Sequence, residues 1–366
     1  MSESAEISIR AYRAGDEQGI AELLRDNYPN TPDVATIRAM WSWQFRNEIS
    51  RDSCVAVAEM NSRIVGHYAV MWLDMTYAGR SIKGAISTAT VTDKSVRGRG
   101  VFLALARKAY ENIAADGCSL VYGFPNSQSV HGFVTKLNWL EPGQFPVHVK
   151  LLKTRAFIAR KIGSGVASST LARIADAALG VWSAITAPAR RKGLLTFEEV
   201  DAIPDEAAAL WASNFGSSRI ALLRDKRYLD WRYLRKPGFE YKFVVAKSAG
   251  RPVAYAVYCV DRKLGLRMMY VMELVVENND AVVTQALCQH LNDLARGHAV
   301  DAISQLVLPG DPGRGIFGRC GYIRVPRKLF PQDIYFGAMA NGVGIDRGFL
   351  GQDANWYISW GDLDVV

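Results

Sequence analysis

The sequence predicts an α/β (α+β) protein of two tandem domains, each a mixed, mostly antiparallel twisted sheet flanked by helices. Three observations support this prediction. The chain has 366 residues, the usual length of two domains. Its 49% hydrophobic and 22% charged residues are typical of globular proteins and exclude a mainly disordered, collagen-like or coiled-coil chain. The same order of helices, three consecutive strands, a helix, a strand, a short helix and a strand recurs in both halves, which indicates an internal structural duplication.

In the first half, the spacing of apolar residues changes between the alternation typical of strands and the three-to-four-residue period typical of helices. ISIRAYRA at 6–13 alternates as a strand does, and Asn61–Ser62 separates two apolar runs as a hairpin turn does. We predict strands at 6–13, 54–60, 63–77, 81–93, 119–124 and 144–153, and helices at 16–26, 33–48, 101–115 and 127–137.

The segment 154–195 is rich in alanine and basic at both ends. One helical stripe runs through it, formed by Leu171, Ile174, Ala178, Leu179, Trp182 and Ile185. Two interpretations remain open: a connecting helix packed between domains, or an interfacial helix over 166–187 that contacts a membrane with its flanking Arg and Lys residues.

The second half repeats the pattern with little residue identity to the first. We predict helices at 204–212, 224–235 and 281–296, a turn into a short helix at 311–320, and strands at 241–247, 253–260, 266–276 and 302–308. The expected organisation is therefore a first domain at 1–153, a helical linker at 154–195 and a second domain at 196–366.

Charge, cysteine usage and the N-terminus limit the classes of partner. The net charge of +8 suits anionic ligands such as phosphates and is too small to indicate DNA binding. The five cysteines form no CxxC pair and the histidines no HExxH spacing, so we expect neither a disulfide framework nor a metal site. The sequence has no apolar signal core and no long apolar run, so we expect a cytoplasmic protein.

A glycine-rich loop between a β-branched strand and an apolar helix is the most informative segment. Gly98 and Gly100 let the backbone approach a ligand closely, and the following amides lie at a helix N-terminus, which favours an anion. The alternative is a plain strand-to-helix turn with exposed arginines. The predicted phosphate-binding residues are Arg97, Gly98, Arg99, Gly100, Val101 and Phe102.

Two common nucleotide-binding loops do not fit this segment. A Walker A loop ends in GK[ST], which is absent here. A Rossmann fingerprint follows the first strand of its unit, whereas this loop follows the fourth predicted strand.

The loop resembles the acyl-CoA loop of the GNAT (Gcn5-related N-acetyltransferase) superfamily, whose pattern is R/Q-x-x-G-x-G/A after a strand. Phe102 replaces the last small residue of that pattern. VYGFPNSQSVHGFVTKLNW at 121–139 resembles the family's next signature, a strand, an Asn and a short helix. The resemblance covers 5–153. It implies cofactor contacts from the backbone of Thr90, Val91 and Thr92 to pantetheine and from Asn126 beside the CoA arm.

The second half resembles a GNAT fold that lacks the loop. After the strand MELVV the chain reads ENNDAVVTQAL, without glycine and with Glu277 and Asp280 to oppose a phosphate. The resemblance therefore implies two tandem GNAT-like domains, the second one degenerate. Such an arrangement is similar to FemABX-like and polysaccharide-associated bacterial acetyltransferases.

Acyl transfer to an amine needs a base, a donor to the thioester carbonyl and a proton source for the leaving thiolate. GNAT proteins commonly use a Tyr as acid and a Glu as base, but this chain has Phe133 near the Tyr position and no Glu in the strand before the loop. The catalytic candidates are Tyr122, His131 and Glu273.

Each candidate also has a structural interpretation. A lone helical histidine such as His131 is more often structural, and Tyr122 fits the core of a strand equally well. Glu273 either faces a cleft or pairs with an arginine such as Arg232 in a buried ion pair. The candidate substrate-binding residues are His67, Trp231, Arg232 and Asp362, with Trp231 in the core of an amphipathic helix as the alternative.

The resemblance implies an N-acyltransferase (N-acetyltransferase) that uses acetyl-CoA or another acyl-CoA as co-substrate and no metal. Its acceptor would be a small amine, such as an amino sugar or another envelope or polysaccharide precursor. Two alternatives remain. One is a catalytically inactive CoA- or nucleotide-binding regulatory module. The other is an aminoacyl-tRNA-dependent FemABX-type transferase, in which the basic helix 224–236 contacts RNA.

Overall fold

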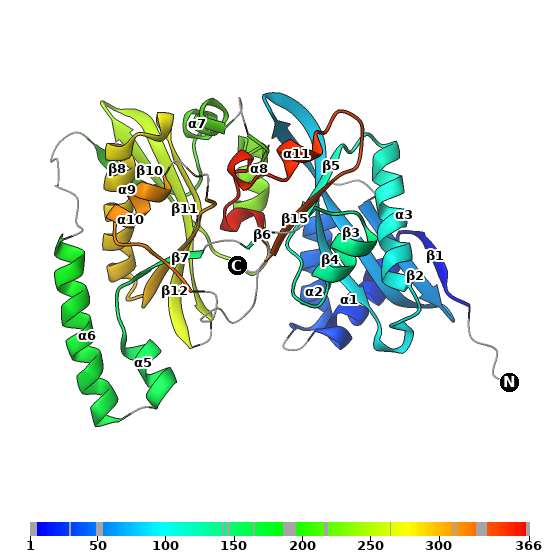
Figure 1. Cartoon of the computed structure of the whole chain (residues 1–366), viewed down its shortest axis with the longest axis horizontal. Helices are drawn as coiled ribbons and strands as arrows, with labels where there is room; N and C mark the ends of the chain where they lie inside the picture. Colours follow the sequence, from blue (N-terminus) through cyan, green and yellow to red (C-terminus); the bar gives the residue numbers. More distant parts are fainter. Residues whose placement is uncertain are drawn as a thin grey trace. The chain divides into compact units, whose positions relative to one another are not determined.

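The computed structural model describes the chain with short gaps and divides it into two compact units (Figure 1). Unit 1 comprises Met1–Gln144, Arg235–Gly238 and Gln332–Gln352, and unit 2 the remaining three segments. The described residues are 6–28, 31–48, 54–140, 143–144, 147–163, 165–185, 195–215, 219–263, 265–309, 311, 313–326 and 335–363.

Unit 1 contains a mixed sheet in the order β1-β2-β3-β4-β5-β15-β6. Only β4 and β5 pair in parallel along this path, and the other neighbours are antiparallel. Asn61 and Ser62, between β2 and β3, have the positive φ values that a tight hairpin turn requires. The hairpin predicted from the sequence is therefore confirmed. The strands are β1 (Ser8–Ala11), β2 (Val55–Met60), β3 (Arg63–Tyr77), β4 (Arg80–Thr92), β5 (Leu120–Gly123), β6 (Gly143–Gln144) and β15 (Tyr335–Ala340).

Helices cover both faces of this sheet, and neighbouring residues of β3 identify them. The ring of His67 lies 6.1 Å from that of Trp41 in α2, whereas the ring of Tyr68 lies 5.7 Å from that of Tyr110 in α3. Because successive side chains of a strand point to opposite faces, α2 and α3 lie on opposite sides. The helices of unit 1 are α1 (Asp16–Asn27), α2 (Val34–Phe45), η2 (Lys94–Val96), α3 (Val101–Ala115), α4 (Val130–Lys136) and α11 (Arg347–Leu350).

Unit 2 contains a second mixed sheet in the order β14-β7-β13-β12-β11-β10-β8, in which only β12 and β13 pair in parallel. The two sheets confirm the predicted fold class. The strands of this sheet are β7 (Val147–Leu151), β8 (Thr196–Val200), β10 (Lys242–Ser248), β11 (Arg251–Lys263), β12 (Leu266–Val276), β13 (Ala302–Leu306) and β14 (Ile323–Arg324), and the short strand β9 (Ala221–Leu222) lies outside it.

The main core of unit 2 lies between this sheet and helices α9 and α10, where Leu287, Leu291 and Phe317 are buried against strand residues. No helix within the described ranges is long and apolar enough to cross a membrane. The helices are α5 (Arg155–Ile162), α6 (Val166–Ile185), α7 (Asp205–Phe215), α8 (Lys226–Leu229), η3 (Asp230–Leu234), η4 (Glu277–Asn279), α9 (Ala281–Gly297), α10 (Arg314–Arg319), η6 (Asp353–Asn355) and η7 (Trp360–Asp362).

Each sheet includes at least one strand from the other half of the sequence. β7, which the sequence pattern places at the end of the first half, pairs with β13 and β14 in unit 2. β15, from the second half, pairs with β5 and β6 in unit 1. The domain boundaries at 153 and 195 stay a prediction about where the two copies of the fold end and begin in the sequence. The compact units differ from those copies because each contains a strand from the other half.

Candidate functional site

The end of β4 is the feature of unit 1 from which the candidate site is built. β4 and β5 pair over four positions, Gly84–Ser87 with Leu120–Gly123. β4 then continues to Thr92 while β5 ends at Gly123, so within the described residues the backbone of 88–92 does not pair with β5. The predicted pantetheine-binding residues Thr90, Val91 and Thr92 lie in this extension.

The loop after β4 has the conformation that its glycines predict. Gly98 and Gly100 both have a φ of +77°, a backbone region that other residues enter at a cost. Gly100 is the N-cap of α3 and supplies no side-chain cap, and the loop residues 97–100 are exposed. Because the first turn of a helix leaves its amides without intrahelical partners, the start of α3 offers open N–H donors to an anion.

The two loop arginines lie beside these amides and extend the positive surface. Arg97 donates from Nε to the carbonyl of Thr92 over 3.1 Å, which ties the loop back to the end of β4. Arg99 is also exposed. Phe102 projects from the first turn of α3, and its ring lies 5.4 Å from that of Phe133 and 6.0 Å from that of Tyr68.

A bulge in β4 lies within this extension, at Ala89, and His67 is hydrogen-bonded to it. Ala89 has a φ of +47°, and the β3–β4 register shifts between His67 and Ala69. His67 Nδ1 lies 2.6 Å from the carbonyl oxygen of Ala89, and Trp41 Nε1 donates to His67 Nε2 over 3.1 Å. His67 is therefore a neutral, fully buried ring with its proton on Nδ1. This position does not support the substrate contact that we expected for His67.

We expect His67 to make stability depend on pH below neutrality. Burial lowers the pKa of His67 from 6.5 to about 4. Between those values the unfolded chain binds a proton that the folded chain does not, so stability falls as pH falls from about 6.5 to 4. The full contribution is about 3 kcal/mol. Urea unfolding at several pH values should show a shallower decline for His67→Gln than for the wild type. The control His131→Gln, at an exposed histidine, should keep the wild-type slope; a parallel decline in all three proteins would contradict the assignment.

A chain of hydrogen-bonded side chains fills the α3 side of the sheet where β4 and β5 separate. The Tyr68 hydroxyl lies 2.7 Å from Ser87 Oγ and 2.6 Å from the Tyr110 hydroxyl, and Trp139 Nε1 donates to Tyr110 over 3.1 Å. Burial raises the pKa of Tyr68 and of Tyr110, so both keep their protons. Sequence reasoning missed this network, because each aromatic side chain on its own has the spacing of an ordinary core residue.

The remaining predicted residues of the first half lie around the end of β5. Tyr122 is buried, with its ring 6.0 Å from that of Phe124 and 6.4 Å from that of Phe336. Asn126 is exposed after β5, and its Oδ1 accepts hydrogen bonds from the amides of 128 and 129. His131 is exposed on α4.

Unit 2 differs from unit 1 at the equivalent helix start. After β12, the short helix η4 leads to α9, whose N-cap Asp280 accepts hydrogen bonds from the amides of Val282 and Val283 at 2.7 and 3.1 Å. A carboxylate thus occupies amides of the kind that Gly100 leaves open in α3. The start of α9 is closed to a phosphate both by hydrogen bonding and by charge.

Glu273 lies in a buried ionic cluster of unit 2. Its Oε1 accepts from Arg224 Nε at 2.7 Å and from the Tyr233 hydroxyl at 2.8 Å, and its Oε2 accepts from Tyr357 at 3.3 Å. Arg224 also donates to Asp362. Glu273 and Arg224 are both 0% exposed. Burial raises the pKa of Glu273, and the charge of Arg224 opposes this rise.

The cluster corrects two expectations from the sequence. The arginine paired with Glu273 is Arg224, not Arg232, whose guanidinium donates to the carbonyls of Gly361 and Leu363. Asp362 pairs with Arg224 and accepts from the Ser359 amide, so neither its position nor that of Arg232 supports substrate binding. Trp231 is buried against Tyr228, as its structural interpretation predicts.

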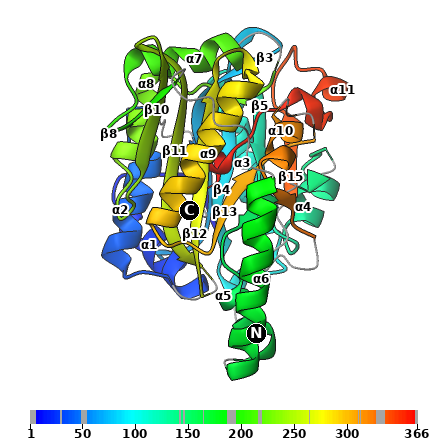
Figure 2. The same ribbon diagram turned by 90° about the vertical axis from the view of Figure 1, so that its left-hand side faces the viewer.

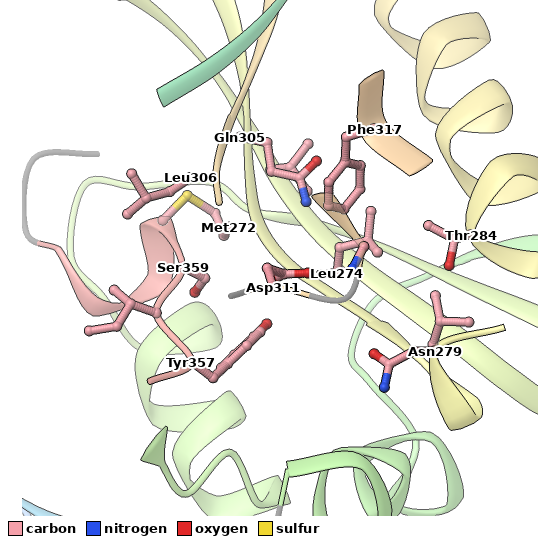
Figure 3. Close-up of a pocket in the computed structure, with 14 residues that line it drawn as sticks. Met272, Leu274, Asn279, Thr284, Gln305, Leu306, Asp311, Phe317, Tyr357 and Ser359 are labelled. Carbon is pink, nitrogen blue, oxygen red and sulfur yellow. Dashed lines mark hydrogen bonds between the residues drawn. The ribbon is translucent and has the colours of Figure 1, made fainter. Parts of the chain in front are cut away.

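A cavity of unit 2 lies where β12 and β13 separate (Figure 3). Tyr357 and Ser359 line it from the C-terminal segment, Gln305 from β13 and Phe317 from α10. Its volume is ≈ 30 Å³, enough for roughly one or two water molecules. The opening between the parallel strands of unit 2 is therefore nearly filled by side chains, which does not suit a cofactor arm.

Comparisons with known proteins agree with the fold of both units. Residues 8–139 match the family model of the acetyltransferase (GNAT) domain. A structure from Enterococcus faecalis, described as a probable N-acyltransferase, has 10% identity and a TM-score of 0.63 over 92% of this chain and 72% of its own. A GCN5-related N-acetyltransferase from Anabaena variabilis has 12% identity and a TM-score of 0.62, with 92% and 74% coverage.

Saccharomyces cerevisiae N-myristoyltransferase with bound myristoyl-CoA has 11% identity and a TM-score of 0.58, covering 97% of this chain and 88% of its own. At these identities the likeness shows the fold alone. A comparison with curated protein sequences finds no match.

Proposed function

We propose, from the premise that residues 8–139 form a domain of the GNAT superfamily, that this chain is an acyl-CoA-dependent N-acyltransferase. The observation that supports the proposal is the start of α3. There, glycines at positive φ, open helix amides and two exposed arginines lie next to the part of β4 that pairs with β3 but not with β5. A pyrophosphate needs such a set of donors, and an extended pantetheine arm needs a free strand edge beside it.

In this proposal the loop and the strand extension have separate roles. The amides of 98–102 bind the pyrophosphate of CoA, and Arg97 and Arg99 add charge that favours it. The backbone of Thr90–Thr92 pairs with the pantetheine arm, and Asn126 lies beside that arm at the end of β5. Acetyl-CoA is the proposed co-substrate.

His131 and Tyr122 are proposed for proton transfer, and they differ in their exposure to solvent. His131 is exposed on α4, and Tyr122 is buried at the end of β5. A general acid or base contributes roughly 10²–10⁴ in rate. Substitution of the responsible residue should therefore lower kcat by that factor and change the KM for acetyl-CoA little. His131→Gln and Tyr122→Phe, measured in parallel, assign the role. We assign Glu273 to the buried cluster and not to the chemistry.

The acceptor is proposed to be a small amine, such as an amino sugar or another envelope or polysaccharide precursor. A panel of amines, with released CoA measured by thiol titration, tests this substrate class. Acetyl-CoA binding without turnover of any amine would instead favour a regulatory binding module. Phe133, which stands near the position of the family's acidic Tyr and has no hydroxyl, is also compatible with such a module. The tRNA-dependent alternative loses support, because Arg224, Arg232 and Lys236 of its basic helix are buried.

We expect one acetyl-CoA site per chain. The amides at the start of α3 are open, whereas those of α9 are capped by Asp280, so of these two equivalent helix starts only that of unit 1 offers open donors to a phosphate. Isothermal titration calorimetry should give a stoichiometry of one. The absence of heat and of any shift in melting temperature would overturn the proposed function, and two equivalent sites would overturn the distinction between the units.

A further inference from the structure

The helical hairpin α5–α6 of unit 2 exposes its largest apolar side chains. α5 and α6 pack side by side (Figure 1), with α6 nearer to the viewer in Figure 2, and a break at Gly163, whose φ is +83°, separates them along the chain. On the packed side of α6 the buried residues are small, Ser168 and Ala172. On its open side, Ile174 is 63% exposed and Trp182 52%. This is the reverse of the usual arrangement, in which large apolar residues face the protein.

The exposed apolar residues share one face of α6. At 3.6 residues per turn, Val166, Leu171, Ile174, Val181 and Trp182 fall within an arc of about 160°. The same count places Ser168 and Ala172 outside this arc. Scattered apolar residues on a surface need no explanation, but a continuous helical face of them indicates a partner. We call these five residues the apolar face of α6.

The α5–α6 hairpin has an excess of positive charge. Five cations lie within 153–185, and all five are exposed: Lys153, Arg155, Arg160, Lys161 and Arg173. Asp176 is the one acid of that segment, and it is held against α5 by the amide of Thr154 at 2.6 Å and its hydroxyl at 2.8 Å. An apolar helical face that includes a tryptophan, on a hairpin with an excess of positive charge, complements an anionic lipid surface.

We propose that the α5–α6 hairpin binds the surface of anionic phospholipid membranes, with the apolar face of α6 inserted among the acyl chains near the headgroups. α6 lies parallel to the membrane plane, because α5 covers its other side. The excess positive charge of the hairpin attracts the anionic headgroups. The proposal does not depend on the acyltransferase function, because it rests on a different part of the chain.

Flotation of the full chain with vesicles tests this inference. We expect binding to vesicles of phosphatidylcholine and phosphatidylglycerol in a 7:3 molar ratio, and a loss of binding when the salt concentration is raised or phosphatidylglycerol is omitted. Ile174→Gln/Val181→Gln should weaken partitioning by roughly 30-fold, since two apolar side chains lose their burial in lipid.

The matched control is Ser169→Gln/Gly180→Gln, which places the same side chain twice on α6 outside the apolar face. It should bind vesicles within about two-fold of the wild type, where a two-fold change is about 0.4 kcal/mol. Circular dichroism checks that both variants keep their helix content. No flotation of the wild type, or equal flotation of the two variants, would overturn the proposal. Concentration-dependent self-association that the Ile174→Gln/Val181→Gln variant abolishes, without vesicle binding, would also overturn it and assign the face to a second copy of the chain.

Discussion

Arg224→Met is expected to lower the free energy of unfolding by about 3–5 kcal/mol, because it leaves two buried carboxylates without their cation. Glu273 and Asp362 both bind the Arg224 guanidinium, and all three side chains are at most 1% exposed. The hydroxyls of Tyr233 and Tyr357 can still donate to Glu273 but cannot neutralise it. Chemical denaturation followed by tryptophan fluorescence measures the loss.

The control for this prediction is an ion pair of the same chemistry at the surface. Arg235 pairs with Glu48 at 2.9 Å, with side chains 61% and 68% exposed. Arg235→Met should therefore change stability by less than about 1 kcal/mol. Arg224→Met/Glu273→Gln should recover part of the loss, since one of the two stranded charges is removed. A loss in Arg224→Met no larger than that in Arg235→Met would show that the cluster is not held by its charges.

Gly98→Ala/Gly100→Ala is expected to weaken acetyl-CoA binding by roughly 10-fold or more, because each alanine costs about 1–2 kcal/mol in the left-handed backbone conformation. A methyl group at either position meets no protein atom within 4 Å, so the cost lies in the backbone. In the variant the loop leaves the left-handed conformation, and the binding free energy falls because acetyl-CoA must restore that conformation. Calorimetric titration with acetyl-CoA measures the change in Kd.

Gly117→Ala is the matched control, because Gly117 lies just beyond the other end of α3 with a φ of +90° and equal space around it. Its backbone strain is of the same kind, but it is remote from the phosphate donors. Gly117→Ala should lower stability and leave the Kd for acetyl-CoA within about two-fold, about 0.4 kcal/mol. If both variants bind acetyl-CoA as the wild type does, the loop does not hold the phosphates.

Local signals explain which parts of the structure the sequence could predict. α3 begins and ends at the predicted residues 101 and 115, and β12 matches its predicted bounds of 266 and 276, because apolar periodicity and glycine breaks specify such elements locally. The conformation of the loop at 97–100 was predictable for the same reason, since the positive φ values of Gly98 and Gly100 follow from their residue type.

Contacts between distant residues explain what the sequence could not predict. Nothing near Glu273 in the sequence distinguishes Arg224 from Arg232, because the choice depends on how helical and extended segments pack in unit 2. His67 has the sequence context of an ordinary strand residue, and its burial against Trp41 and Ala89 follows from the pairing of β3 with β4 and the position of α2. The roles of Tyr122 and His131 stay predictions.

The exchange of β7 and β15 has a consequence for how the protein is made. β15 lies between β5 and β6 in the sheet of unit 1, so that sheet lacks an interior strand until residue 340 has left the ribosome. At roughly 5–20 residues per second, the first 144 residues wait about 10–40 seconds in the growing chain with β5 as an unpaired edge. An exposed edge strand is prone to pair with other chains. Nascent chains of this protein are therefore expected to depend on chaperones for longer than those of a GNAT domain whose strands are consecutive.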